Sequence, residues 1–228
     1  ELNGVQVTDQ LKNEIFVITS RRLMEKVVNE LHLDVFYSTS SGLRPISLFN
    51  IRPFKATFGP SYHGDLSFNV EVREGDELQI SNMRLDGEKL DFKRTVTYGT
   101  IVPTPGGAFG LDKEVYASEF VGKVITVSRV NKDAAVDYYR NLISAAEYDK
   151  EANLITVTMK DINSTRAKDV LTTLLNVYKQ DIVEVKNTVA SNTAHFIDNR
   201  IRLIGGELSN VESKLAQYVV DKLLGQVK

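Results

Sequence analysis

The feature that most constrains the fold is a heptad pattern of apolar residues in the last part of the chain. In the stretch from Phe196 to Lys228, these residues recur at alternating intervals of four and three positions. They are Ile197, Ile201, Ile204, Leu208, Val211, Leu215 and Tyr218. This spacing places them on one face of an α-helix and predicts that the face packs against a second helix. Because the sequence ends at Lys228 before any such helix, we expect the partner to come from elsewhere.

Helical periodicity already begins near Ser164. One continuous helix from there to the end would be about 95 Å long, at about 1.5 Å per residue. A compact domain of this size cannot bury such a helix along its whole length, so we expect part of it to project. Its first turns should cover the sheet of the protein's base through Leu171, Leu174, Tyr178 and Val185.

Gly205 and Gly206 lie side by side within this helix. Two glycines in a helix cost on the order of 2 kcal/mol relative to alanine. Close approach of a neighbouring helix would offset that cost, and so would a functional bend. A tolerated weak point is the third interpretation, and the sequence leaves all of them open.

The five prolines all lie between Pro45 and Pro105, which separates a region of strands and loops from a helix-rich region. Short alternating runs between the prolines predict strands, and turn signals such as Asp86-Gly87 separate them. The runs are LSFNVEV (66–72), ELQIS (77–81) and TVTYGTI (95–101). Strands at this spacing predict a small β-sandwich or partial barrel.

The segments that flank this region mix helix and strand. Helical spacing runs from Thr8 to about Leu31, followed by a strand over residues 33–38. Farther on, the pattern predicts a strand–helix–strand unit over residues 123–130, 133–148 and 153–160. The fold class expected is therefore α+β. We expect a mixed α/β base from residues 1–42 and 119–190, a β-rich insertion at 43–118, and a projecting coiled-coil helix at 191–228.

Composition excludes several classes of function. The chain has 228 residues, a net charge of −2 and a pI near 6.0, so it lacks the basic surface typical of nucleic-acid binding. It has no cysteine, which excludes disulfides, thiolate metal sites and cysteine nucleophiles. Apolar runs such as residues 16–19 are far shorter than the ~20 residues that cross a bilayer, and no signal peptide opens the chain. We therefore expect a soluble segment with both ends cut.

No residues stand out as catalytic, cofactor-binding or metal-ligating. His32, His63 and His195 lie in different elements without metal-ligand spacing, and we interpret them as solvent-facing or structural. Asn163-Ser164-Thr165 matches a glycosylation sequon, but we favour a helix N-cap.

Aromatic and basic side chains leave carbohydrate contact open. Tyr62, Tyr98 and Tyr116 are of the type that stacks on sugars, although packing within the sandwich is the favoured interpretation. The basic pairs Arg21-Arg22 and Arg200/Arg202 belong to solvated helix faces or intersubunit ion pairs, or else guide an acidic polysaccharide.

The order of these segments resembles the extracytoplasmic region of bacterial polysaccharide co-polymerases, the Wzz-type chain-length determinants. Residues 13–35 are similar to the family's opening helix and strand, and residues 125–178 to its strand, helix, second strand and following helix. HFIDNRIRLIGGELSNVESKLAQYV (195–219) is similar to its long helix. These segments cover about two thirds of the chain. The β-rich insertion resembles that of the branch that carries a cytoplasmic tyrosine kinase.

The resemblance implies a periplasmic scaffold module of an inner-membrane protein, with transmembrane helices on both sides of this sequence. Such a module forms a ring-like homo-oligomer and regulates the chain length or export of capsular polysaccharide or exopolysaccharide. The implied partners are sibling subunits, a polysaccharide polymerase, an outer-membrane export channel and the polysaccharide itself. The region would not be an enzyme and would need no cofactor, whereas ATP and Mg would serve only a kinase domain outside it.

Two other classes remain as alternatives. A periplasmic adaptor of a secretion or efflux system also joins a β-rich body to helices, but it places a helical hairpin inside the β domains. A carbohydrate-active β-sandwich enzyme would require two carboxylates in a cleft and would leave the unpaired helix unexplained.

Overall fold

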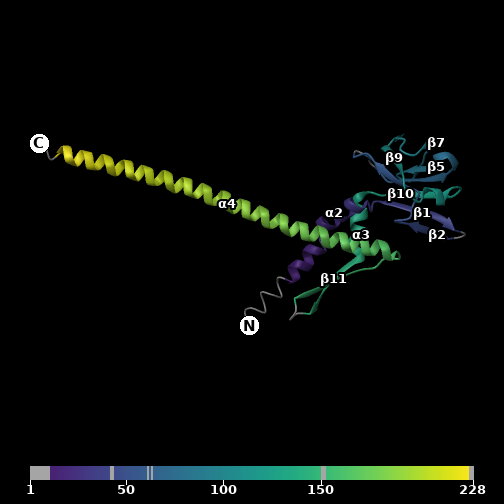
Figure 1. The fold of residues 1–228 in the computed structure, drawn as a ribbon, viewed down its shortest axis with the longest axis horizontal. Coiled ribbons are helices and arrows are strands. Elements are labelled where there is room, and N and C mark those ends of the chain that lie inside the picture. Colours follow the sequence, from purple (N-terminus) through teal and green to yellow (C-terminus); the bar gives the residue numbers. More distant parts are fainter. Residues whose placement is uncertain (1–10, 42–43, 61, 63, 150–152, 226–228) are drawn as a thin grey trace. The chain divides into compact units, whose positions relative to one another are not determined.

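A computed structural model describes residues 11–41, 44–60, 62, 64–149 and 153–225, and the side chains among them as far as residue 217, with the exception of Ser41. The fold is α+β, as predicted, with antiparallel sheets and one long C-terminal helix (Figure 1). The chain divides into two units, Glu1–Tyr178 and Lys179–Lys228. Among the described residues, the first unit holds all the strands and the hydrophobic core, and the second, as far as Gly225, belongs to the long helix.

The largest sheet is antiparallel and has seven strands, in the order β2-β1-β10-β4-β5-β6, with β7 also paired to β5. Its strands are β1 (Val35–Ser41), β2 (Arg44–Leu48), β4 (Leu66–Val72), β5 (Glu77–Leu85), β6 (Glu88–Lys89), β7 (Arg94–Thr97) and β10 (Val124–Arg129). The run LSFNVEV forms β4 with strictly alternating burial, as its sequence predicts. Its buried residues begin with Leu66 and include Phe68 and Val70.

A second sheet packs on the first and completes a β-sandwich. It has the order β3-β9-β8, from β3 (Phe54–Phe58), β9 (Gly107–Lys113) and β8 (Val102–Thr104). The two sheets share one hydrophobic cluster, in which Phe68 of β4 stacks on Phe109 of β9 with ring centroids 4.7 Å apart. Burial of this cluster is the main driving force for closing the sandwich.

The turns of the sandwich use the residues that the sequence marked for them. Asp86 and Gly87, between β5 and β6, both have positive φ, of 51° and 84°, as a tight hairpin of this twist requires. Gly75 (φ 71°) lies within the 3-10 turn η1 (Glu74–Asp76), and a second such turn, η2 (Ala117–Phe120), precedes β10. The turn predicted at Asp86-Gly87 is confirmed.

A helical layer forms the rest of the first unit. It contains a helical segment over residues 11–18, α2 (Arg21–Leu31), α3 (Lys132–Leu142), the hairpin of β11 (Ile143–Asp149) and β12 (Leu154–Met159), and the start of α4 (Ser164–Gly225). Their apolar side chains form a second cluster, which includes Leu23, Val27, Val136, Tyr139, Val170 and Leu174. Phe36 of β1 also packs there, parallel to the ring of Tyr139.

Several boundaries differ from the sequence-based prediction. The first helix is interrupted at Ser20, whose side chain accepts a hydrogen bond from the Leu23 N–H and caps α2; Thr8 lies outside the described residues. Residues 143–148 were predicted as helix but form β11, because pairing with β12 satisfies their backbone groups. The expected strand–helix–strand unit is therefore split between two sheets, since β10 belongs to the large one.

The large sheet also continues across the boundaries expected at residues 42 and 119. Strands β1 and β10 lie outside the expected insertion, whereas β4 and β5 lie inside it. Yet β10 pairs with β1 on one side and β4 on the other. One face of this sheet contributes Tyr37 to the sandwich core, and the other contributes Phe36 to the helical layer.

Candidate functional site

The long helix α4 begins at a fixed and buried point. The Asn163 side chain accepts a hydrogen bond from the Arg166 N–H at 3.0 Å, which confirms the predicted N-cap. Arg166 in turn donates two hydrogen bonds of 2.7 Å to the carboxylate of Asp161. Their side chains are only 8% and 1% exposed, so this is a buried and bidentate ion pair.

The first turns of α4 pack into the helical layer. Val170, Leu174 and Val177 are buried there, and the Tyr178 hydroxyl donates to the carboxylate of Glu14. The expectation that these turns cover the base is confirmed for Leu174, but it was wrong for Val185, whose side chain is 52% exposed. A sequence pattern cannot show where on a continuous helix the core ends.

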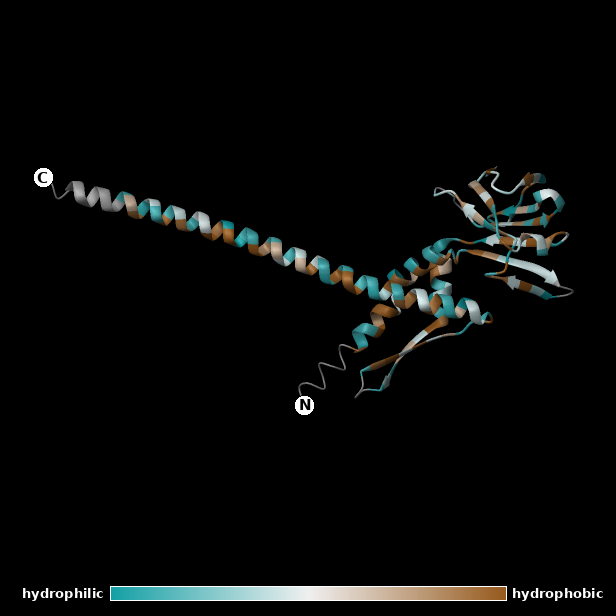
Figure 2. Ribbon diagram, viewed as in Figure 1, coloured by the Kyte–Doolittle hydropathy of each residue, from teal (hydrophilic) through white to brown (hydrophobic). Residues whose placement is uncertain are grey.

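Beyond this anchored part, α4 carries the predicted apolar seam on an exposed surface. Every residue from 183 to 217 is exposed, and hydrophobic residues recur among hydrophilic ones along the helix (Figure 2). Six predicted seam residues are between 49% and 63% exposed. They are Ile197, Ile201, Ile204, Leu208, Val211 and Leu215. Tyr218 continues the helix, but its side chain lies outside the described residues.

The seam is a narrow stripe along the helix. At about 100° per residue, its described members fall within an arc of about 80° around the axis. Isolated exposed apolar residues are normal on protein surfaces, but a stripe of branched aliphatic side chains with heptad spacing is typical of helix pairing.

The seam begins earlier than the sequence-based prediction placed it. Continuing the intervals of four and three backwards from Ile197 leads to Ala194, Ala190, Asn187 and Val183, all of them exposed. The same heptad spacing is present in the sequence before Ile197, but most of these positions carry small or polar side chains and were therefore not recognised as part of the seam. Asn187 falls at a position that is normally apolar, and a polar residue there fixes the register of paired helices.

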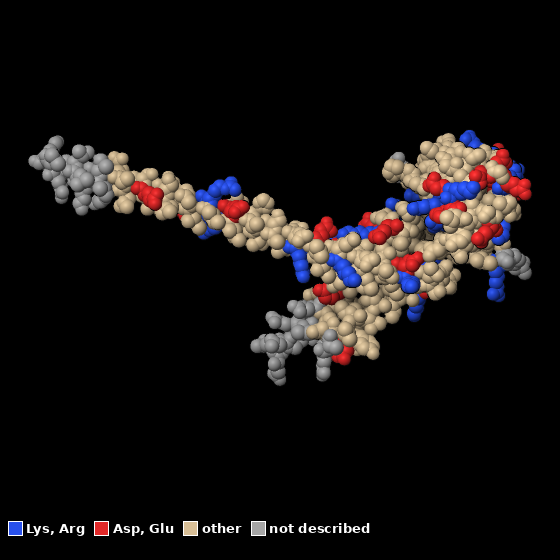
Figure 3. Space-filling model, in the orientation of Figure 1, with Lys and Arg blue, Asp and Glu red and all other residues tan. Residues whose placement is uncertain are grey.

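Charged residues flank the seam on both sides. One flank carries Arg200, Glu207 and Lys214 at intervals of seven residues, and the other carries Asp198 and Glu212. Figure 3 shows groups of both signs along the helix. Flanking charges of mixed sign select the orientation and identity of a partner helix more than they add to its affinity.

Gly205 and Gly206 are helical, and a Cβ added at either would have no neighbour within 4 Å among the described residues. By helical geometry Gly205 borders the seam, whereas Gly206 lies on the opposite face. Within the described chain, no other helix approaches these glycines. Whether a partner does, or whether they provide a bend, stays a prediction.

The tyrosines singled out for sugar contact are placed differently from one another. Tyr62 is buried in the sandwich core, so the packing interpretation is confirmed for this ring. Tyr98 is half-buried beneath Lys113, with the ammonium 5.6 Å from the ring centroid, and its pKa is raised by burial and then by Asp76. Tyr116 is 37% exposed, beside η2.

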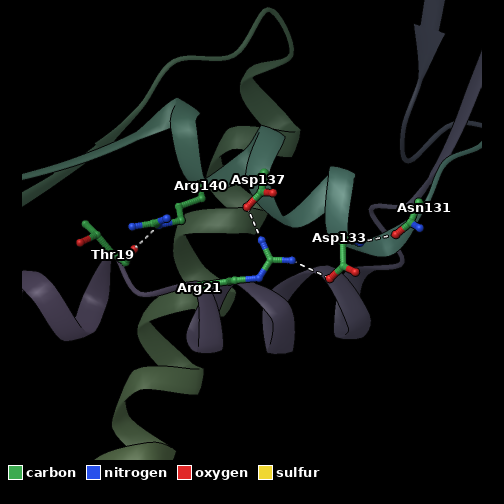
Figure 4. A network of polar contacts seen from close by, with 6 residues as sticks. All are labelled: Thr19, Arg21, Asn131, Asp133, Asp137 and Arg140. Atoms are coloured by element: carbon green, nitrogen blue, oxygen red, sulfur yellow. Dashed lines mark hydrogen bonds and ion pairs between the residues drawn. The ribbon is translucent and has the colours of Figure 1, made fainter.

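Arg21 of the first basic pair belongs to an ion-pair network between α2 and α3 (Figure 4). Its guanidinium bridges Asp137 and Asp133, the latter at 2.5 Å. Arg140 donates from α3 to the Thr19 carbonyl at 2.9 Å. Arg21 is therefore paired within this chain, which the sequence-based interpretation did not foresee, whereas Arg200 and Arg202 are exposed on α4.

The two histidines among the described residues lie in different elements. His32 ends α2 in the left-handed conformation, and His195 is exposed on α4. His63 lies outside the described residues.

A comparison of the chain with protein-family models gives no match. Within the described residues, no helix combines the length and the apolar character that crossing a membrane requires.

Proposed function

We propose that this chain is a scaffold module that assembles through the exposed seam of α4. The observation that carries the proposal is the contrast along this one helix. Its first turns are capped and buried around Arg166 and Leu174, whereas its aliphatic stripe from Ile197 to Leu215 has no partner among the described residues. A helix of this length with an uncovered heptad face is stable in water mainly when a second helix covers that face.

The energy available from the seam favours a tethered partner. Fully burying a Leu or Ile side chain contributes about 1.5–3 kcal/mol, so covering these half-exposed ones contributes about 1 kcal/mol each. The free energy gained by covering all six residues is similar to the translational and rotational entropy cost of bringing two free chains together. Pairing is therefore expected where a membrane or a neighbouring domain holds the partner helix close, which raises its effective concentration.

The flanking charges argue against a parallel pair of identical helices. In heptad terms, Ile201 and Leu208 take position a, so Glu207 falls at g and Glu212 at e. In a parallel homodimer, g of one helix faces the following e of the other, which would bring Glu207 against Glu212. This repulsion favours an antiparallel or a different helix as the partner.

In biological terms, we propose that the module is the periplasmic region of an inner-membrane polysaccharide co-polymerase. There it would form a ring with sibling subunits and help to set the chain length or export of a capsular polysaccharide or exopolysaccharide, next to a cytoplasmic tyrosine kinase. The α+β unit, the order of its segments and the long helix support this proposal.

Single cysteines test the pairing directly, since these 228 residues contain none and any cysteine elsewhere in the protein can be replaced first. In the natural protein that carries this sequence, assembled in its own membrane, Leu208→Cys should be protected from a maleimide reagent. The matched control is Asn199→Cys, on the opposite face of the same helix, which should be labelled quickly. Equal labelling of the two thiols in the intact assembly would refute pairing through the seam.

The cellular role has a separate readout. Leu208→Asp places a charge in the seam and should broaden or shift the length distribution of the surface polysaccharide, while Asn199→Asp should leave it unchanged. If Leu208→Asp disrupts assembly but the polysaccharide stays the same, the scaffold interpretation survives and the co-polymerase role is wrong.

A further inference from the structure

A cationic cavity of about 210 Å³ lies in the first unit, away from the seam. The C-terminal end of α2, the start of β1, strand β3, the end of β10 and the start of α3 meet around it. Four of its lining side chains are basic or can become so: His32, Lys55, Arg129 and Lys132. Asp34 is the one acidic residue among its described lining residues.

Arg129 forms the buried wall of this cavity and is held rigidly. Its guanidinium lies 4.8 Å from the ring centroid of Tyr62 and 5.1 Å from that of Phe58, and it donates to the Gly64 carbonyl at 3.1 Å. These contacts fix its position but do not neutralise its charge.

Arg129 forms a buried ion pair with Asp34, but the pair lacks a hydrogen bond. The arginine Nε is 3.6 Å from the carboxylate of Asp34, and the two side chains are 10% and 8% exposed. Within the described part of the chain, this buried Nε has no hydrogen-bond partner. An unsatisfied donor on a buried cation is costly, and such a group commonly marks a place where an anion or water binds.

The two lysines lack acidic partners among the described residues. Lys132 donates to the neutral side chain of Asn29 at 2.9 Å. Lys55 forms no ion pair within the described residues, and Asp112, opposite it on β9, accepts a hydrogen bond from Thr57. The cavity therefore carries more positive than negative charge.

The pKa of His32 reflects its partial burial and the same excess of positive charge in the cavity. Partial burial lowers the pKa of this imidazole, and the positive charge of Lys55 lowers it further, with Lys132 and Arg52 acting in the same direction. Asp34 opposes them. At neutral pH His32 is therefore mostly uncharged, and its ring remains available as a hydrogen-bond donor or acceptor.

We propose that this cavity binds a carboxylate or phosphate group of a small anionic ligand, held between Lys55 and Lys132 with Arg129 behind it. Lysines supply mobile point charges at the mouth, and the buried arginine supplies a fixed one. The volume admits a group of several non-hydrogen atoms, such as a phosphate or the acidic end of a uronic acid sugar. The proposal is independent of helix pairing, since every residue it uses lies within Glu1–Tyr178.

The test is a titration of the 228-residue chain, followed by NMR at constant ionic strength, with inorganic phosphate, D-glucuronate and the neutral sugar D-glucose in separate arms. Phosphate or glucuronate should cause saturable shifts of the Lys55 and Lys132 amide signals, and glucose should not. Binding of phosphate alone identifies a phosphate site, and stronger binding of glucuronate identifies a site for an acidic sugar.

Charge-removing variants decide whether the cavity is responsible. Lys55→Gln and Lys132→Gln should each weaken binding about tenfold, the effect of losing one charge-assisted hydrogen bond. Lys168→Gln, an exposed lysine on α4, is the matched control and should bind as the unaltered chain does. Both cavity lysines are at least partly exposed, so these variants should keep the same melting temperature without ligand.

The proposal is overturned if neither anion gives saturable shifts. It is also overturned if glucose binds equally well, or if Lys168→Gln weakens binding as much as the cavity variants do, which would show a general surface effect.

Discussion

Replacing Arg166 by methionine should destabilise the first unit strongly. Methionine keeps much of the side-chain volume but removes both hydrogen bonds to Asp161, whose carboxylate is 1% exposed. Breaking a buried pair from one side costs about 3–5 kcal/mol, because the remaining charge stays buried without its partner. Small domains have about 5–15 kcal/mol of total stability, so this loss would shift the urea midpoint far to lower concentrations.

The assay can follow tyrosine fluorescence, since the chain has nine tyrosines and no tryptophan. Only Tyr218 lies within the second unit, so the signal reports mainly on the first. A double-mutant cycle with Asp161→Asn separates the pair from packing effects. The double variant should be more stable than the sum of the two single losses predicts. A loss below about 1 kcal/mol for Arg166→Met, the value of an exposed ion pair, would refute the reasoning.

The same pair gives a pH signature. Burial alone would raise the pKa of Asp161, but the hydrogen bonds from Arg166 and from the Asn163 and Ile162 backbone outweigh it, so the pKa is lowered. A lowered pKa contributes stability above the ordinary carboxylate pKa, and that stability disappears as the pH falls through the lowered value. Arg166→Met removes the hydrogen bond and the charge that oppose burial, so the folded-state pKa of Asp161 moves toward or above its unfolded value. Less stability, or none, should then be lost as the pH falls below the ordinary carboxylate pKa, which urea titrations at several pH values would measure.

Four further substitutions test other parts of the structure. Burial raises the pKa of Tyr139 to about 12, so as the pH rises the unfolded chain loses this proton before the folded chain does, and stability should fall between about pH 10 and 12. In urea titrations over this range, Tyr139→Phe should lose about 1–3 kcal/mol less stability than the unaltered chain. Parallel curves of stability against pH for the two proteins would contradict this. Gly206→Ala should raise the helix content seen by circular dichroism, since alanine stabilises a helix by about 1 kcal/mol and meets no neighbour at this site. Gly205→Ala should also raise the helix content of the isolated chain. If a partner helix packs against the side of the seam where Gly205 lies, this variant should impair assembly of the natural protein, whereas the control Gly206→Ala should not. Arg21→Ala should lower the free energy of unfolding by less than about 1 kcal/mol, because its partners are exposed, and a larger loss would show that the network of Figure 4 is coupled to the core.

Local signals in the sequence predicted the elements that depend on local chemistry. The heptad stripe, the alternation of Leu66–Val72, the Asp86-Gly87 turn and the Asn163 cap are each set within a few residues. The interruption at Ser20 was also detectable, since serine is a preferred N-cap residue.

Tertiary pairing accounts for what the sequence did not predict. Ala145, Ala146 and Glu147 favour a helix locally, yet pairing with β12 makes them strand. The cationic cavity joins Lys55 and Lys132 from segments far apart in the chain, so no local pattern could reveal it. The end of the buried part of α4, between Tyr178 and Val185, likewise depends on what packs against the helix.

Strand β1 has a consequence for how the first unit melts. Its neighbouring residues Phe36 and Tyr37 point into different hydrophobic clusters, the helical layer and the sandwich. Neither cluster can open without exposing a side of the same strand, so the two should unfold cooperatively in one calorimetric transition. A substitution deep in the sandwich, far from any helix, should therefore lower the melting temperature of the helical layer by the same amount.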